Sequence, residues 1–272
     1  MHPNIAFIGG GNMAASLIGG LLKSAHPAAR VRVAEPDAAR ADWLRDELRV
    51  DVRARGAEVV AGCAAIVLAV KPQAMREALR DLKPDAGATI ISIAAGVRLA
   101  TIQRALGKAL HYVRTMPNTP ALYGCGITGL FAPSATPAAA RELAQNILAA
   151  AGATVWLPRE EDLDAVTALS GSGPAYFFLL TEALREAGEA LGLEKQTASQ
   201  LARQTCVGAG RMLQDAAVDV AELRAQVTSK GGTTEAAVTH LEASGLRAIF
   251  RDALRKAAER ARAMGDALDA QT

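Results

Sequence analysis

The chain has 272 residues, of which 50% are apolar and 21% are charged, and its 30 basic and 28 acidic side chains give a formal net charge of +2. This balance is typical of a folded protein and excludes a disordered one, and the charges form no basic block of the kind that binds nucleic acid. The most apolar windows, 63–70 and 175–180, are far shorter than the ~20 residues of a membrane span, and the N-terminus lacks the basic region of a signal peptide. A cytoplasmic protein without nucleic-acid or membrane partners is therefore expected.

The first predicted elements are a strand over 4–8, a glycine turn and a helix. The turn has the form G-x-G-x-x-A, in which Gly9 permits a tight bend, Gly11 leaves room for a pyrophosphate, and Ala14 lets the helix pack on the strand. This context between strand and helix favours a dinucleotide site over a chance cluster of glycines. The residues expected to bind the cofactor here are Gly9, Gly10, Gly11, Asn12 and Met13.

A second strand over 31–34 ends at Glu35, at about the spacing expected for the acidic residue that binds the adenosine ribose. A carboxylate there accepts from a ribose 2′-OH and repels a 2′-phosphate, so the local chemistry favours NADH. Arg40, one turn into the next helix, could offset that repulsion, and Glu35 could equally be an ordinary solvated strand end.

The alternation of strands and helices continues and predicts a parallel sheet. The expected elements are a strand over 66–70, a helix over 72–81, a strand over 89–93, a helix over 99–106, a strand over 110–114, a helix over 137–150 and a strand over 154–157. Ligands of such sheets bind at the carboxyl ends of the strands. The cofactor-binding residues expected there are Val70, Lys71, Pro72, Ala94, Ala95, Gly96 and Asn118.

After Pro158 the periodicity is helical. The expected helices cover 163–170, 174–191, 196–214, 220–227, 233–243 and 246–268. We therefore expect an α/β fold with a Rossmann-like, doubly wound, mostly parallel sheet in residues 1–158 and an all-α domain in residues 159–272. The small residues over 197–210 suit close helix packing, either in an internal core or at a subunit interface.

A loop rich in glycine and hydroxyl groups leads into the helix over 233–243. Gly231 and Gly232 let the backbone turn, and Ser229, Thr233 and Thr234 add hydroxyl donors beside the free N–H groups of a helix N-terminus. This pattern suits a carboxylate, although an isolated loop of this kind would more often be a plain helix cap. The dinucleotide motif at the other end of the chain favours the carboxylate site.

With these motifs in place, the sequence resembles the pyrroline-5-carboxylate reductase family over essentially its whole length. The stretches that carry the resemblance are 7–14, 69–72, 92–97, 116–120, 170–176 and the loop that ends in Gly231–Gly232–Thr233–Thr234. The resemblance implies hydride transfer from NAD(P)H to C5 of Δ1-pyrroline-5-carboxylate, which gives L-proline in the last step of proline biosynthesis. It places Thr234 and Ser229 in the catalytic site, with the substrate bound by Ser229, Gly231, Gly232, Thr233 and Thr234 and with Thr234 facing the ring nitrogen. It also implies a homodimer formed by the helical domain, and it allows a ring of dimers.

The chemistry agrees with the residues present. A protonated imine accepts hydride readily, so the site needs alignment and a carboxylate anchor, and no strong acid from the protein. The cysteines Cys63, Cys125 and Cys206 form no C-x-x-C pair, so neither a metal site nor a disulfide is expected.

The chain departs from the family pattern in three places. Glu35 stands where many members have a small hydroxyl residue that suits NADPH, Gly56 replaces a frequent asparagine, and Lys230 replaces a frequent proline. NADPH is the cofactor expected from the family and NADH the one favoured locally by Glu35, so both stay open.

Two other functions remain to be weighed. A β-hydroxyacid-dehydrogenase-like oxidoreductase would need a lysine and an asparagine in the long helix, at the places that Phe177 and Thr181 occupy. A non-catalytic NAD(P)-sensing module would have no use for a second anion site. Oxidation of the cofactor on addition of the imine separates a reductase from a sensor.

Overall fold

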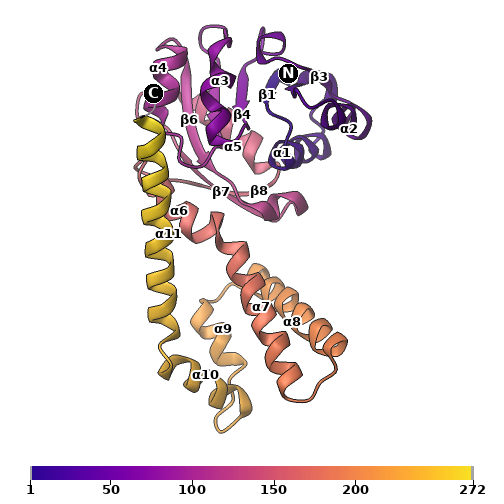
Figure 1. The fold of residues 1–272 in the computed structure, drawn as a ribbon, viewed down its shortest axis with the longest axis vertical. Coiled ribbons are helices and arrows are strands. Elements are labelled where there is room, and N and C mark those ends of the chain that lie inside the picture. Colours follow the sequence, from indigo (N-terminus) through magenta and orange to yellow (C-terminus); the bar gives the residue numbers. More distant parts are fainter. Residues whose placement is uncertain (1, 271–272) are drawn as a thin grey trace. The chain divides into compact units, whose positions relative to one another are not determined.

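The computed structural model describes residues 2–270, and its contacts divide the chain into two compact units (Figure 1). The sheet unit contains the chain up to Ser172 together with the residues from Ala257 onward, and the helical unit runs from Gly173 to Lys256. The last strand ends at Trp156, near the expected boundary between 158 and 159, whereas the division by contacts falls after Ser172. The boundary of the functional domains therefore stays a prediction.

The sheet unit is built on eight strands in the order β3-β2-β1-β4-β5-β6-β7-β8. Their bounds are β1 Ile5–Ile8, β2 Val31–Ala34, β3 Asp51–Arg53, β4 Ala65–Leu68, β5 Thr89–Ser92, β6 His111–Met116, β7 Gly126–Phe131 and β8 Gly152–Trp156. Every pairing is parallel except that of β6 with β7. The order 3-2-1-4-5-6 of the first six strands is that of a dinucleotide-binding Rossmann sheet, which confirms the predicted fold class.

Helices cover both faces of this sheet. They are α1 Asn12–Lys23, α2 Ala38–Leu48, α3 Met75–Arg80, α4 Leu99–Leu106, α5 Ala138–Ala149 and α6 Asp162–Val166, joined by the C-terminal part of α11 Leu246–Asp269. Short 3-10 turns lie at Ala28–Arg30, Gly56–Glu58, Pro72–Ala74 and Thr119–Tyr123, and a π-helical turn at Thr167–Gly171 follows α6.

The core forms because successive strand residues point to opposite faces. Ile5 and Phe7 of β1 belong to one apolar cluster, and Ala6 and Ile8 belong to the other. All of β1 and β4 is buried, as expected for central parallel strands that helices cover on both sides.

The structure corrects several element assignments. Strands β3 and β7 were not predicted, the strand expected over 66–70 ends at Leu68, and the helix expected over 72–81 is a 3-10 turn followed by α3. The helix expected over 163–170 is α6 followed by the π-helical turn. No described helix is both long enough and apolar enough to cross a membrane.

The helical unit consists of α7 Gly173–Ala190, α8 Lys195–Asp215, α9 Val220–Gln226, α10 Thr233–Ala243 and the first part of α11. Helices α7 and α8 approach closely because Gly188 faces Ala198, whose Cβ would lie 3.3 Å from a Cβ added at Gly188. Few side chains of this unit are buried, and several large apolar side chains are exposed, among them Phe177, Phe178, Leu179, Leu180, Leu201 and Val207. Exposed apolar surface of this extent is typical of a subunit interface.

Candidate active site

The glycine turn after β1 has a backbone geometry that requires glycine at its first position. Gly9 has φ +97°, and an added Cβ would lie 2.9 Å from the carbonyl oxygen of Ala69. Its N–H donates to Ala34 O at 2.8 Å, which fixes the turn between β2 and the segment after β4. A side chain at this position would meet both backbone strain and a backbone collision.

Two charged side chains hold Gly10 in place. Its N–H donates to Glu35 Oε2 at 2.8 Å, and its carbonyl accepts from Arg40 Nε at 2.6 Å. A Cβ added at Gly10 would lie 2.4 Å from Leu44 Cδ1. The turn is therefore closed on the side of α2 and fixed before any ligand binds.

Gly11 is open where its neighbours are closed. It caps α1 with extended backbone, and a Cβ added there would meet nothing within 4 Å. The N–H groups of Asn12 and Met13 belong to the first turn of a 12-residue helix and have no intrahelical acceptor. An open space in front of these donors suits an anionic pyrophosphate, so this segment fits a dinucleotide.

The loops after β4 and β5 lie at the same edge of the sheet as the glycine turn. Lys71 is exposed after β4, Ala94 is buried after β5 and donates to Ser92 Oγ at 3.4 Å, and Gly96 has φ +75°. A Cβ added at Gly96 would lie 3.4 Å from Gly265 N of α11. The predicted cofactor residues Val70, Lys71, Pro72, Ala94, Ala95 and Gly96 thus come from two adjacent strands beside β1.

The loop before α10 forms a glycine turn that leads into the helix N-terminus. Gly231 has φ +72°, and Gly232 caps α10 and donates to Ser229 O at 3.0 Å. The Thr233 and Thr234 side chains are exposed at the first two helical positions. Their N–H groups lack intrahelical acceptors because they open the helix, so two backbone donors and the nearby hydroxyls are available to a carboxylate.

Comparison with known proteins places this geometry in a family. The chain is 47% identical to the pyrroline-5-carboxylate reductase of Pseudomonas aeruginosa, over 98% of both chains, and 39% identical to that of Pasteurella multocida, over 96% of this chain and 97% of the other. The chain belongs to the pyrroline-5-carboxylate reductase family. This confirms the resemblance that the motifs indicated, and it makes the chain a reductase.

Solved structures and family models agree with this assignment. A pyrroline-5-carboxylate reductase structure from Coxiella burnetii superposes with a TM-score of 0.91 at 40% identity, covering 97% of this chain and 99% of the other. A Plasmodium falciparum pyrroline carboxylate reductase with NADP bound gives a TM-score of 0.82 at 27% identity, covering 97% and 98%. Residues 160–264 match a model described as pyrroline-5-carboxylate reductase dimerisation, and residues 4–96 match one described as NADP oxidoreductase, coenzyme F420-dependent.

Sequence reasoning missed a residue that shapes the loop before α10. Glu235, the third residue of α10, turns back so that its Oε2 accepts from Gly231 N–H at 2.6 Å. In a capping box the acid at the third helical position accepts from the N-cap N–H, whereas Glu235 reaches one residue further back, from the position of Gly232 to Gly231. The signal in the sequence was the acidic residue just after the two threonines.

Asn118, a predicted cofactor residue, is 8% exposed and holds two loops together. Its Nδ2 donates to Ser170 O at 3.1 Å, and its Oδ1 accepts from Ile127 N–H at 2.9 Å. The amide thus ties the turn after β6 to the π-helical turn and to β7. A contact with the cofactor stays a prediction for this residue.

A buried ion cluster supports the same region of the reductase. The Arg114 side chain of β6 is 3% exposed. Its Nη1 lies 3.2 Å from Glu160 Oε1, and its Nη2 lies 3.5 Å from Asp164 Oδ1. Glu160 Oε1 also accepts from Leu99 N–H at 2.8 Å, at the start of α4. An arginine in the middle of a buried strand was the signal for this cluster, which fixes α6 and the first turn of α4 on the sheet.

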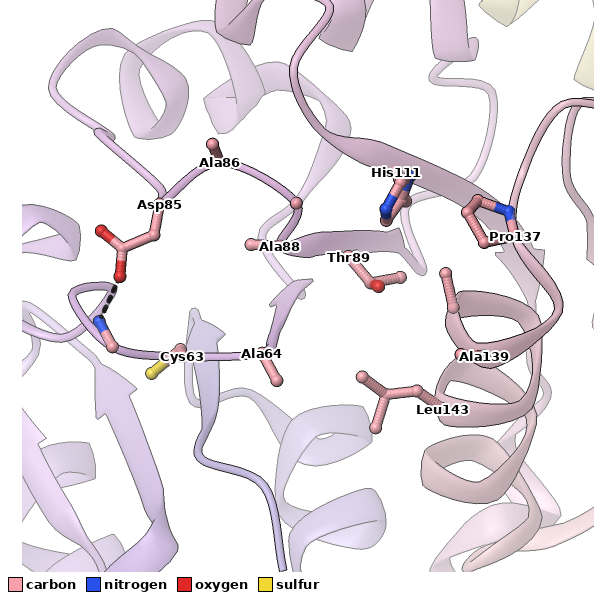
Figure 2. A pocket seen from close by; sticks show the side chains of 13 residues that line it. Cys63, Ala64, Asp85, Ala86, Ala88, Thr89, His111, Pro137, Ala139 and Leu143 are labelled. Atoms are coloured by element: carbon pink, nitrogen blue, oxygen red, sulfur yellow. Dashed lines mark hydrogen bonds between the residues drawn. The ribbon is translucent and has the colours of Figure 1, made fainter.

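A hollow of about 460 Å³ lies at the opposite edge of the sheet, at the amino ends of β4, β5 and β6 (Figure 2). Asp85 forms part of its wall, and its carboxylate accepts a hydrogen bond from Gly62 N–H at 2.8 Å. The Cys63 thiol donates to Val59 O at 3.2 Å, and burial raises its pKa, which keeps it protonated and unreactive.

Proposed function

We propose that this reductase transfers a hydride from NADPH or NADH to C5 of Δ1-pyrroline-5-carboxylate and releases L-proline. The proposal is supported by the loop 229–234, whose hydroxyls and helix N-terminus suit a carboxylate, in a chain that matches pyrroline-5-carboxylate reductases from end to end. A dehydrogenase acting on a hydroxyacid is disfavoured, because the positions where such an enzyme needs its lysine and asparagine hold Phe177 and Thr181.

The sheet unit would hold the dinucleotide through its backbone. When bound, the nicotinamide supplies the hydride. The N–H groups of Asn12 and Met13 would donate to the pyrophosphate, in the space that Gly11 leaves open. The loops that contain Lys71 and Ala95 would line the nicotinamide end, since they follow β4, which pairs with β1, and β5, which pairs with β4.

The helical unit would hold the imine through the loop before α10. The N–H groups of Thr233 and Thr234 and the hydroxyl of Ser229 would bind the carboxylate, and Gly232 lets the chain approach it closely. The Thr234 hydroxyl would face the imine nitrogen and stabilise the amine that forms there. The substrate can arrive with its nitrogen protonated, so a loop of hydroxyls and N–H groups is sufficient.

The choice between NADH and NADPH depends on the residues that follow β2. A Glu35 carboxylate that accepted from the ribose 2′-OH would favour NADH. Its two oxygens already accept backbone N–H groups, Oε2 from Gly10 at 2.8 Å and Oε1 from Asp37 at 3.0 Å. Each oxygen keeps a further lone pair, so both cofactors remain part of the proposal.

We further propose a homodimer formed through the helical unit. The match of residues 160–264 to the dimerisation model supports it, as do the exposed apolar side chains of α7 and α8, such as Phe178 at 71% and Leu201 at 54% exposure. Assembly of dimers into a ring stays a prediction that the mass in solution tests. A cytoplasmic location fits an enzyme that draws on the cell's reduced nicotinamide cofactors.

The experiment that tests the reaction is product analysis with the purified full chain. We expect L-proline to form from the imine in a one-to-one ratio with the cofactor oxidised, and we expect no cofactor oxidation with a 2-keto acid. Oxidation with the keto acid, or cofactor loss without proline, would contradict the proposal.

A further inference from the structure

The Arg40 side chain is held in one orientation beside the glycine turn. It lies in the first turn of α2, where its backbone N–H donates to Asp37 Oδ1 at 2.7 Å. Its Nε donates to Gly10 O at 2.6 Å, and its guanidinium carbon lies 4.3 Å from the centre of the Trp43 ring. Its Nη2 is enclosed and has no hydrogen-bond partner among the described residues.

Nη2 is covered by protein, so the guanidinium charge has no acceptor there, but the Arg40 side chain as a whole is only partly buried, and an anion that reaches its accessible part would be stabilised. Stacking on Trp43 and the bond to Gly10 hold the guanidinium plane in one orientation, which reduces the entropy lost when it binds a ligand. Arg40 is thus a preorganised anion receptor next to the dinucleotide turn.

The topology identifies which anion of the cofactor this is. The adenosine ribose of a Rossmann cofactor lies beside the end of the second strand, and the pyrophosphate lies at the N-terminus of the first helix. Arg40 follows β2, whereas the open donors of Gly11–Met13 belong to α1. Arg40 therefore faces the ribose side of the turn, where NADPH differs from NADH by a phosphate.

We infer that Arg40 is the residue of this reductase that selects NADPH, by donating from its guanidinium to the 2′-phosphate. In this arrangement Glu35 serves as a clamp for the turn, since both its oxygens accept from the backbone at Gly10 and Asp37. The inference rests on the proposed function, since it assigns the cofactor of the same reaction. It is an alternative to the local preference for NADH that Glu35 suggests from sequence alone.

The test uses nucleotide fragments, so it needs neither the imine nor turnover. Calorimetry of the full chain with 2′,5′-ADP and with 5′-AMP compares molecules that differ only in the 2′-phosphate. We expect the wild-type chain to bind 2′,5′-ADP at least about tenfold more tightly, the effect of one charge-assisted bond. Equal affinities, tighter binding of 5′-AMP, or no measurable binding of 2′,5′-ADP would overturn the assignment.

Variants on one helix then locate the preference. Arg40→Gln is expected to bring the two affinities within about twofold, because their ratio reports the contact with the 2′-phosphate, whereas loss of the bond to Gly10 O affects both ligands alike. The matched control is Arg45→Gln, also on α2, whose Nη1 pairs with Asp42 at 2.6 Å, and it is expected to keep the wild-type ratio. If Arg40→Gln fails to fold, Arg40→Met retains the aliphatic stem over Trp43 and takes its place. A folded Arg40 variant that keeps the tenfold ratio would overturn the inference.

The two proposals fail in different ways. Selective binding of 2′,5′-ADP without proline formation would contradict the reaction and leave Arg40 assigned. Proline formation with equal fragment affinities would contradict only the role of Arg40.

Discussion

Replacement of Gly11 by alanine should separate cofactor binding from folding. Gly11 has φ −61° and ψ −178°, a backbone that alanine adopts without strain, and a Cβ there meets no protein atom within 4 Å. The new methyl group would instead occupy the open space in front of the first N–H groups of α1, where the pyrophosphate is expected.

The size of both effects follows from this geometry. Alanine caps a helix less well than glycine, by about 0.5–1 kcal/mol, and a similar amount is regained because the unfolded chain becomes less flexible. The free energy of unfolding should therefore change by less than about 0.5 kcal/mol. Loss of one charge-assisted hydrogen bond, about 1.5–3 kcal/mol, should weaken cofactor binding about 10- to 100-fold.

The assay pairs urea unfolding with calorimetric titration of NADPH. Gly19→Ala is the matched control, because Gly19 lies in the same helix and a Cβ there also meets nothing within 4 Å. That variant should be slightly more stable, by up to about 1 kcal/mol, with unchanged cofactor affinity. Wild-type affinity in a folded Gly11→Ala variant would refute the position assigned to the pyrophosphate.

Further predictions concern the two loops. Gly9→Ala should lower the free energy of unfolding by about 2–5 kcal/mol, because the backbone has φ +97° and the new Cβ would lie 2.9 Å from Ala69 O. A urea unfolding midpoint near that of wild type would contradict this prediction. Thr234→Ala should lower kcat about 10- to 100-fold with NADPH affinity unchanged, and steady-state kinetics with calorimetry would reveal the opposite pattern if the loop held the cofactor. Glu235→Ala should raise KM for the imine several-fold, because it frees the Gly231 N–H. Glu235→Gln keeps an acceptor for that N–H and should behave like wild type. Equal KM values in the two variants would show that Glu235 does not support the loop.

Local signals made much of the fold predictable. The central strands are continuous apolar runs because both faces are covered, and the glycine turn follows the first of them directly. Strand β3 escaped prediction because it has only three residues, of which Asp51 and Arg53 are exposed. Strand β7 escaped because Gly126 and Gly129 weaken its pattern and because it pairs antiparallel with β6, which no alternation of strands and helices indicates.

The sequence could predict those site residues that lie next to one another in the chain. The turn at Gly9–Gly11 and the loop at Gly231–Thr234 are contiguous, so spacing was sufficient to find them. The links to Gly10 from Glu35 and Arg40 span 25 and 30 residues, so they depend on the pairing of β1 with β2. Whether Glu35 meets a ribose or the backbone is a matter of rotamer, which no sequence pattern specifies.

The most direct test of the proposed reaction follows the hydride itself. The purified chain is supplied with Δ1-pyrroline-5-carboxylate and NADPH carrying deuterium at both positions of nicotinamide C4, and the product is analysed by mass spectrometry. We expect L-proline with one deuterium, bonded to C5. Unlabelled proline, deuterium at another carbon, or no proline from a folded chain that binds NADPH would contradict it.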